Sequence, residues 1–172
     1  YAKNLQEITG AVFIEPFNDE DVIAGQGTIG LEILEKMLDV DTVIVPIGGG
    51  GLISGIATAI KSIKPSCKVI GVQSENAPSM KRSLEEGKII QLDSVNTIAD
   101  GIAVKTPGTL TYEICKQYVD EVVTVNEEEI AAAVQSCHHR HRCLGAVLPI
   151  HLLGHRHISA DPAGDLVMVG HR

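Results

Sequence analysis

The sequence predicts an α/β protein with a three-layer α/β/α arrangement, in which helices cover a mainly parallel sheet. Apolar runs of strand length alternate with stretches of helix length along most of the 172 residues, and this alternation is typical of parallel sheets with helical crossovers. The runs TVIVPI (42–47) and KVIGVQ (68–73) are almost continuously apolar. Such runs are expected for strands that are buried on both faces.

The first part of the chain is expected to hold two helices and one short strand. The expected elements are a helix that ends before Gly10, a strand over 11–16 (AVFIEP), a loop over 17–28, and a helix over 29–38. Gly10 is a stop signal because glycine readily takes the left-handed conformation at a helix end. Thr28 is expected to cap the second helix, since a threonine hydroxyl can accept from a free N–H of the first turn.

The alternation is expected to continue to about residue 134. The expected elements are a helix over 52–64 that ends before Pro65, a short helix after Pro78 that stops at Gly87, a helix over 109–119, a strand over 121–125, and a helix from 128. Asn126 and Glu129 form a capping-box pattern before the last helix, in which each side chain accepts from the other residue's backbone N–H.

Composition limits the classes of partner. A net charge of −8 argues against a nucleic-acid or membrane-surface binder, because both need basic patches. No apolar run approaches the ~20 residues that span a bilayer. The four cysteines are scattered without a disulfide framework, which indicates reduced thiols in a cytoplasmic protein. The sequence begins with Tyr1, so we interpret it as a piece of a longer chain.

Composition also divides the chain into two regions, 1–135 and 136–172. All seven histidines and four of the five arginines lie in the second region. It contains the run CHHRHRC, in which Cys137, three histidines and Cys143 are candidate Zn²⁺ ligands. These ligands are too dense to converge on one ion without a separate loop. A divergent or frame-shifted tail is therefore the favoured interpretation, and metal binding is the alternative.

The four glycines after the first buried strand predict an anion site. A helix N-terminus carries free N–H groups and about half a positive charge, and glycine lets those N–H groups approach an oxygen closely. A P-loop is excluded because Leu52 and Ile53 stand where that motif needs a lysine and a hydroxyl residue. A dinucleotide fingerprint matches only Gly48 and Gly50. That motif and a purely steric need for glycine stay open beside a phosphate site.

Six segments of the chain are distinctive when taken together: VIAGQGTIGLEI, VDTVIVPIGGGGLISGIA, KVIGVQSEN, TIADGIAV, PGTLTYEI and VDEVVTVNEEEI. In order and spacing they resemble the bacterial catabolic threonine dehydratases, which belong to the fold-type-II pyridoxal phosphate (PLP) enzymes. Serine racemases and serine dehydratases are close relatives of this group. The resemblance covers residues 1–134 and implies the large-domain part of a tryptophan-synthase-β-like fold.

The resemblance implies where the cofactor binds. Backbone amides of the glycine loop would bind the PLP phosphate, which assigns Gly48, Gly49, Gly50, Gly51 and Leu52. Gly101, from the ADG segment, would lie beside the pyridine ring. Phe17 is given a packing role where some racemases have an asparagine. Gln73 and Ser79 stand where some relatives have two carboxylates for a divalent cation, so no metal is expected.

For a full-length enzyme the resemblance implies PLP-dependent deamination of L-threonine (and L-serine) to 2-oxobutanoate (pyruvate) and ammonia. In that family the lysine that holds the cofactor aldehyde lies in a Ser-x-Lys-x-Arg motif, and no lysine here stands in such a motif. We therefore expect no catalytic residue in this chain and no activity from it alone. The alternatives are a serine racemase or dehydratase, and a noncatalytic phosphate- or nucleotide-binding fragment.

The resemblance also implies the partners of the full-length enzyme. They are a small-molecule amino-acid substrate, a nucleotide effector (AMP or CMP) and further copies of the same chain in a homo-oligomer. Nucleic acid and membranes are not expected partners, and the expected location is the cytoplasm.

Overall fold

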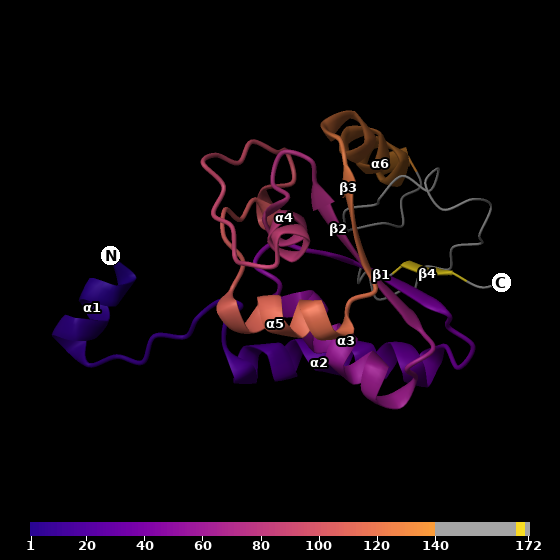
Figure 1. Ribbon diagram of the computed structural model, residues 1–172, viewed down its shortest axis with the longest axis horizontal. Coiled ribbons are helices and arrows are strands. Elements are labelled where there is room, and N and C mark those ends of the chain that lie inside the picture. The colour runs from indigo at the N-terminus through magenta and orange to yellow at the C-terminus, as the bar shows by residue number, and fades with distance from the viewer. Residues whose placement is uncertain (140–167, 171–172) are drawn as a thin grey trace.

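Figure 1 shows the computed structural model of the protein, which describes residues 1–139 and 168–170. Its centre is a four-stranded sheet in the order β3-β2-β1-β4. The strands are β1 (Thr42–Pro46), β2 (Lys68–Ser74), β3 (Glu121–Val125) and β4 (Met168–Gly170). β1, β2 and β3 run parallel, and β4 pairs antiparallel with β1. The prediction of a mainly parallel sheet is confirmed.

Helices cover both faces of this sheet. The helices are α1 (Ala2–Thr9), α2 (Glu20–Lys36), α3 (Gly51–Ile63), α4 (Ser79–Glu86), the 3₁₀ turn η1 (Asp100–Ile102), α5 (Thr109–Tyr118) and α6 (Glu127–His139). Val43 and Val45 of β1 belong to a core shared with α2, α3 and α5, whereas Ile44 packs on the other face with Ile130 of α6. Burying one such side chain contributes about 1.5–3 kcal/mol. Both faces of β1 thus need a covering layer, and the predicted three-layer α/β fold is confirmed.

Residues 11–16 do not form the strand that the sequence predicted. Val12 and Ile14 are 86% and 67% exposed, and the segment projects with α1 away from the sheet (Figure 1). A strand needs a neighbour to pair its N–H and C=O groups. The short apolar run alone therefore does not define a strand here.

α2 begins at Glu20, inside the stretch that was predicted to be a loop. Asp19 is its N-cap, and the Asp19 side chain accepts from two N–H groups of the first turn at 2.9 and 3.1 Å. Thr28 lies in the middle of the helix, where its Oγ1 donates to the carbonyl of Gly25 at 2.8 Å. The predicted cap role of Thr28 is wrong, because the cap of this helix is Asp19, nine positions earlier in the sequence.

Two glycines of α2, Gly27 and Gly30, lie where this helix packs on α3. A Cβ added at Gly55 of α3 would lie 2.3 Å from the carbonyl O of Ile23 and 2.5 Å from the backbone N of Gly27. A Cβ at Gly30 would lie 3.0 Å from the Cβ of Ala59. Backbone therefore meets backbone where α2 crosses α3, and this contact positions α3 together with the loop at its N-terminus.

The other helix ends follow the predicted signals. Gly10 and Gly87 both close their helices in the left-handed conformation, with φ of 70° and 67°. Asn126 and Glu129 exchange side chain to backbone hydrogen bonds of 2.9 Å in each direction. The two stop signals and the capping box are confirmed.

The boundary predicted at residue 136 falls within α6, which runs to His139. The rest of the second region up to residue 167, together with the side chains of the CHHRHRC run, lies outside the described residues. The division into two regions and the nature of the tail therefore stay predictions. In the part that is described, no helix combines the length and the apolarity needed to cross a membrane.

Candidate functional site: a glycine loop at the edge of the sheet

The glycine loop connects the carboxyl end of β1 to the N-terminus of α3. Gly50 is the N-cap of α3 and has a φ of 100°, which residues with a side chain rarely adopt. The first backbone hydrogen bond that closes the helix runs from the N–H of Ser54 to the carbonyl of Gly50 at 3.0 Å. The N–H groups of Gly51, Leu52 and Ile53 therefore have no acceptor within the helix. They form one end of a helix that carries a partial positive charge.

The space around the loop excludes side chains. A Cβ at Gly48 would lie 3.1 Å from the Cα of Ile102, and a Cβ at Gly50 would lie 2.7 Å from Cε of Met80. The loop is thus pressed against neighbouring segments on two sides. Steric need accounts for these two glycines, while the free N–H groups of the helix remain to be explained by a ligand. The residues present fit an anion such as a phosphate, because the free N–H groups of a helix N-terminus lie in a loop without side chains.

Phe17 packs directly over the loop. A Cβ at Gly49 would lie 2.4 Å from the Phe17 ring, and a Cβ at Gly51 would lie 2.9 Å from the Cβ of Phe17. The packing role predicted for Phe17 agrees with this position. The phenyl ring carries no hydrogen-bonding group, so this side chain contributes shape and an apolar wall.

The sequence interpretation missed two residues that make contacts with or from α5: Thr111 bonds α5 to the glycine loop, and Asn18, next to Phe17, bonds to the start of α5. The carbonyl of Gly49 accepts from Oγ1 of Thr111 at 2.6 Å and from the N–H of Gly108 at 3.2 Å. The Oδ1 of Asn18 accepts from the N–H of Leu110 at 2.8 Å. Their partners, the carbonyl of Gly49 and the N–H of Leu110, lie 62 and 92 positions away in the sequence.

The side chain of Gln73 links the end of β2 to Ile47, which precedes the glycines, and to Lys81 of α4. Its side chain is fully buried, its Nε2 donates to the carbonyl of Ile47 at 3.2 Å, and its Oε1 accepts from the N–H of Lys81 at 2.9 Å. The amide thus bonds with both of its ends inside the protein, next to the residue that precedes the glycines. Ser79 is also fully buried. Among the described residues no three His, Cys, Asp or Glu side chains gather as metal ligands.

The segment that carries Gly101 lies beside the first glycine of the loop. A Cβ at Gly48 would lie 3.5 Å from the carbonyl O of Gly101, so the structure brings together all the residues predicted for the cofactor. Gly101 itself has open space at its Cβ position, and its N–H donates to Oδ1 of Asp100 at 2.9 Å. No steric reason for glycine at position 101 is visible in the described part of the chain.

Glu127 of α6 anchors this segment. Its Oε2 accepts from the N–H of Ile98 at 2.8 Å, and its Oε1 accepts from Oγ of Ser74 at 2.7 Å and from Nδ2 of Asn76 at 3.4 Å. Burial raises the pKa of this carboxyl, but the hydrogen bonds together outweigh burial and leave the pKa below its ordinary value. A charged Glu127 therefore ties the Gly101 segment to the end of β2.

The lysines of α3 lie at the opposite end of that helix from the glycines. Nζ of Lys61 forms an ion pair with Oδ2 of Asp120 at 2.6 Å, and Nζ of Lys64 donates to the carbonyl of Leu38 at 2.9 Å. The Lys61 side chain is only 14% exposed. Its ammonium is used in joining α3 to the start of β3.

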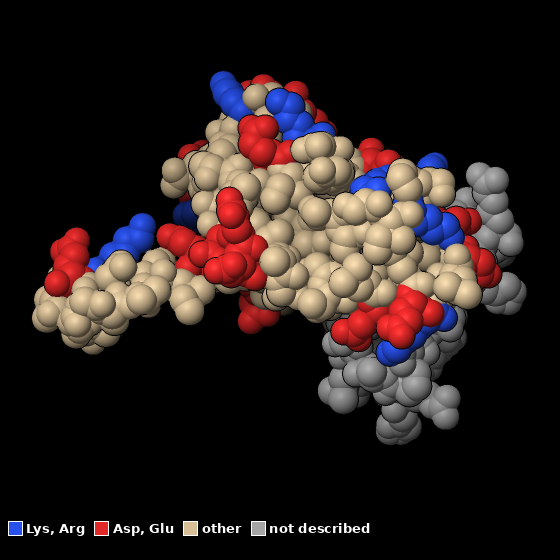
Figure 2. Space-filling view, turned by 90° about the horizontal axis from the view of Figure 1, so that it is seen from below, with Lys and Arg blue, Asp and Glu red and all other residues tan. Residues whose placement is uncertain are grey.

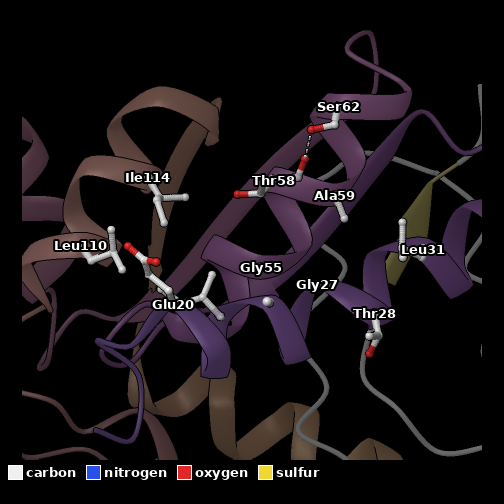
Figure 3. A pocket seen from close by; sticks show the side chains of 12 residues that line it. Glu20, Gly27, Thr28, Leu31, Gly55, Thr58, Ala59, Ser62, Leu110 and Ile114 are labelled. Atoms are coloured by element: carbon white, nitrogen blue, oxygen red, sulfur yellow. Dashed lines mark hydrogen bonds between the residues drawn. The ribbon is translucent and has the colours of Figure 1, made fainter.

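A separate groove of about 480 Å³ runs between α2, α3 and α5 (Figure 3). Small and apolar residues make up most of its lining, to which Glu20 adds a carboxylate. The hydroxyls of Thr58 and Ser62 donate to carbonyls of their own helix at 2.8 and 2.7 Å. Residues 48–52 do not line this groove. It is therefore distinct from the glycine site.

The protein is acidic overall, and the candidate anion site consists of backbone N–H groups without a basic side chain. On the face shown in Figure 2, separate acidic clusters border a broad uncharged surface, and the basic side chains stand in small groups. With a net charge of −8, attraction of an anion to the glycine loop depends on local N–H groups.

Comparison with known proteins places this arrangement in context. The family model described as "Pyridoxal-phosphate dependent enzyme" matches residues 1–146. The L-threonine ammonia-lyase of Thermotoga maritima is 63% identical over 133 residues, which are 77% of this chain and 33% of that protein. Among solved structures, a threonine deaminase from T.th. has a TM-score of 0.80 at 41% identity, and the match covers 83% of this chain and 54% of that one.

A solved maize serine racemase is similar as well, with a TM-score of 0.77, 46% identity, and coverage of 79% of this chain and 42% of its own. This chain spans between 33% and 42% of the length of the first curated relatives that it matches. The family match extends over most of the chain and includes the glycine loop, its supports and the Gly101 segment. The chain therefore belongs to the family of pyridoxal-phosphate dependent enzymes.

Proposed function

We propose that this chain is the cofactor-phosphate-binding part of an L-threonine ammonia-lyase, an enzyme that converts L-threonine to 2-oxobutanoate and ammonia. The observation that carries the proposal is the bare glycine loop in front of the free N–H groups of α3, in a chain 63% identical to a protein named L-threonine ammonia-lyase. The same enzyme would deaminate L-serine to pyruvate.

The backbone of the loop would hold the phosphate of PLP through the N–H groups of Gly48, Gly49, Gly50, Gly51 and Leu52. Gly101 would present its backbone to the pyridine ring, at the place where Glu127 holds the neighbouring residues. When it is bound, the cofactor supplies an electron sink for bonds at the α-carbon of the amino acid. Because the loop uses N–H dipoles and no cationic side chain, it would bind a phosphate without strongly lowering its basicity.

This chain alone is proposed to be inactive, because its lysines do not occur in the motif that holds the cofactor aldehyde. Lys61 and Lys64, the two lysines of the helix that starts at the loop, are engaged at its far end. A serine racemase or serine dehydratase is the second candidate, and it is favoured by the 46% identity to the maize serine racemase. The nucleotide effector, the homo-oligomer and the cytoplasmic location stay predictions from the resemblance.

A chimera tests the function. Residues 1–133 of this chain would replace the matching segment of the Thermotoga maritima L-threonine ammonia-lyase, and 2-oxobutanoate formation from L-threonine would be measured. We expect threonine deamination that needs added PLP, and a chimera with Gly50→Val should lose it. A well-folded chimera that forms D-serine from L-serine, without deaminating threonine, would replace the proposal by the racemase alternative.

The isolated chain provides a second test. It should bind PLP more tightly than pyridoxal, which lacks the phosphate, and borohydride should not fix the cofactor covalently. Covalent fixation to a lysine of this chain, seen as a mass increase on one peptide, would contradict the proposed absence of the cofactor lysine.

A further inference from the structure

The carbonyl of Gly49 is the best-anchored group of the glycine loop. It accepts from Oγ1 of Thr111 at 2.6 Å and from the N–H of Gly108 at 3.2 Å. Thr111 is fully buried, and its hydroxyl also lies 3.2 Å from the carbonyl of Gly108. The shorter distance identifies the Gly49 carbonyl as the main acceptor of the single hydroxyl proton.

These two bonds fix the direction of the next N–H group. All the peptide bonds described are trans, so the carbonyl of Gly49 and the N–H of Gly50 point to opposite sides of the same planar unit. With the carbonyl held against α5, the N–H of Gly50 must point away from α5. It therefore joins the free N–H groups of α3 on the side of the loop that is available to an anion.

A loop of consecutive glycines would not hold this direction by itself. Rotating the peptide unit between Gly49 and Gly50 by half a turn would change φ of Gly50 from its value of 100° to about −80°, which glycine adopts equally well. In that rotated form the carbonyl oxygen would face the anion and repel it. Bare glycine thus allows the approach of a phosphate, and it also allows a conformation that rejects the phosphate.

We propose that Thr111 is a positioning residue for the cofactor phosphate: its hydroxyl holds the Gly49 carbonyl against α5 and so keeps the N–H of Gly50 directed at the phosphate. This inference rests on the proposed function, since it assumes that the loop binds a phosphomonoester. It adds a side chain outside the glycine motif to the residues that determine cofactor affinity. The hydroxyl acts through the loop and has no contact with the ligand.

The test uses the 172-residue chain and measures the dissociation constants of PLP and of pyridoxal, which lacks the phosphate. Thr111→Val removes the hydroxyl and keeps the shape, Thr111→Ser keeps the hydroxyl, and Thr111→Cys offers a weaker donor. Thr58→Val is the matched control, because the Thr58 hydroxyl bonds only to the carbonyl of Ser54 in its own helix at 2.8 Å. Circular dichroism and the urea midpoint establish that each variant is folded.

We expect Thr111→Val to bind PLP about tenfold more weakly, as the loss of one buried hydrogen bond allows, with pyridoxal binding unchanged. Thr111→Ser and Thr58→Val should stay within about twofold of the original chain. Thr111→Cys should be intermediate, and it takes the place of the valine variant if that variant does not fold.

Two outcomes would overturn the inference. If Thr111→Val, or Thr111→Cys in its place, binds PLP as tightly as the original chain, or loses affinity for PLP and pyridoxal alike, the hydroxyl does not position the phosphate loop. If the original chain shows no preference for PLP over pyridoxal, the phosphate-binding function itself fails, and the role of Thr111 fails with it.

Discussion

Gly55→Ala is the most direct test of how α2 positions α3. The added methyl group would lie 2.3 Å from the carbonyl O of Ile23 and 2.5 Å from the backbone N of Gly27. Both of these atoms belong to the backbone of α2, so no side-chain rotation can relieve the clash. To restore an ordinary contact of 3.4 Å, the two helices must separate by about 1 Å.

The expected cost is the difference between two opposing effects. Overpacking of this kind destabilises a folded chain by about 1–3 kcal/mol, while alanine in a helix interior is favoured over glycine by about 0.5–1 kcal/mol. Taking the middle of each range, we expect a net loss of about 1 kcal/mol in the free energy of unfolding. For a chain of this size that loss lowers the unfolding temperature by about 2–4 °C.

Urea and thermal unfolding, followed by circular dichroism, measure the loss. Gly25→Ala is the matched control, because Gly25 lies in α2 with no atom within 4 Å of the added methyl group. That variant should gain about 0.5–1 kcal/mol from helix propensity alone. If Gly55→Ala is as stable as the original chain or more stable, the backbone contact between α2 and α3 does not have the tightness that we infer.

Three further outcomes are expected. The pKa of Glu127 is lowered on folding, so this carboxylate contributes its full stabilisation above its ordinary pKa of 4.5, and the stabilisation is lost as the pH falls from there through the lower pKa of the folded state. Glu127→Gln should flatten the acid-side dependence of the urea midpoint on pH, and an unchanged slope would refute this. Burial raises the pKa of the Cys115 thiol to about 12, so iodoacetamide at about pH 8 should modify Cys115 only in denaturant. Peptide mass mapping measures this modification, and rapid modification of the folded chain would contradict the buried position. Lys61→Met should lower the free energy of unfolding in urea by about 1 kcal/mol, because it removes the ion pair with Asp120 while keeping the apolar stem. Lys88→Met is the control: the ion pair of Lys88 is exposed, so its loss should leave the free energy of unfolding almost unchanged.

The sequence was informative where one element carries its own signal. The buried strands over 42–46 and 68–74, the helix after the glycines and the capping box at Asn126 all depend on local patterns. They were predicted with nearly the observed boundaries. The glycine loop is also a pattern that is continuous in sequence, and its role as an anion site stays a prediction.

The predictions failed where contacts between segments distant in sequence determine the local structure. Gly25 and Gly27 suggested a loop, but α2 needs a glycine where its backbone touches Gly55, and the helix continues through both positions. Residues 11–16 begin with an apolar run of strand length but have no strand to pair with among the described residues. Thr111 and Asn18 could not be identified, because each acts on a segment that is distant in sequence.

The anchoring of the Gly49 carbonyl has a consequence for the order in which the chain folds. The loop leaves β1 early in the sequence, yet its final shape depends on Gly108 and Thr111, about 60 residues further along. Closing so long a connection is entropically costly and is completed late. The N–H of Gly108, which donates to the Gly49 carbonyl, should therefore become protected from hydrogen exchange only after the pairing of β1 with β2 is already established.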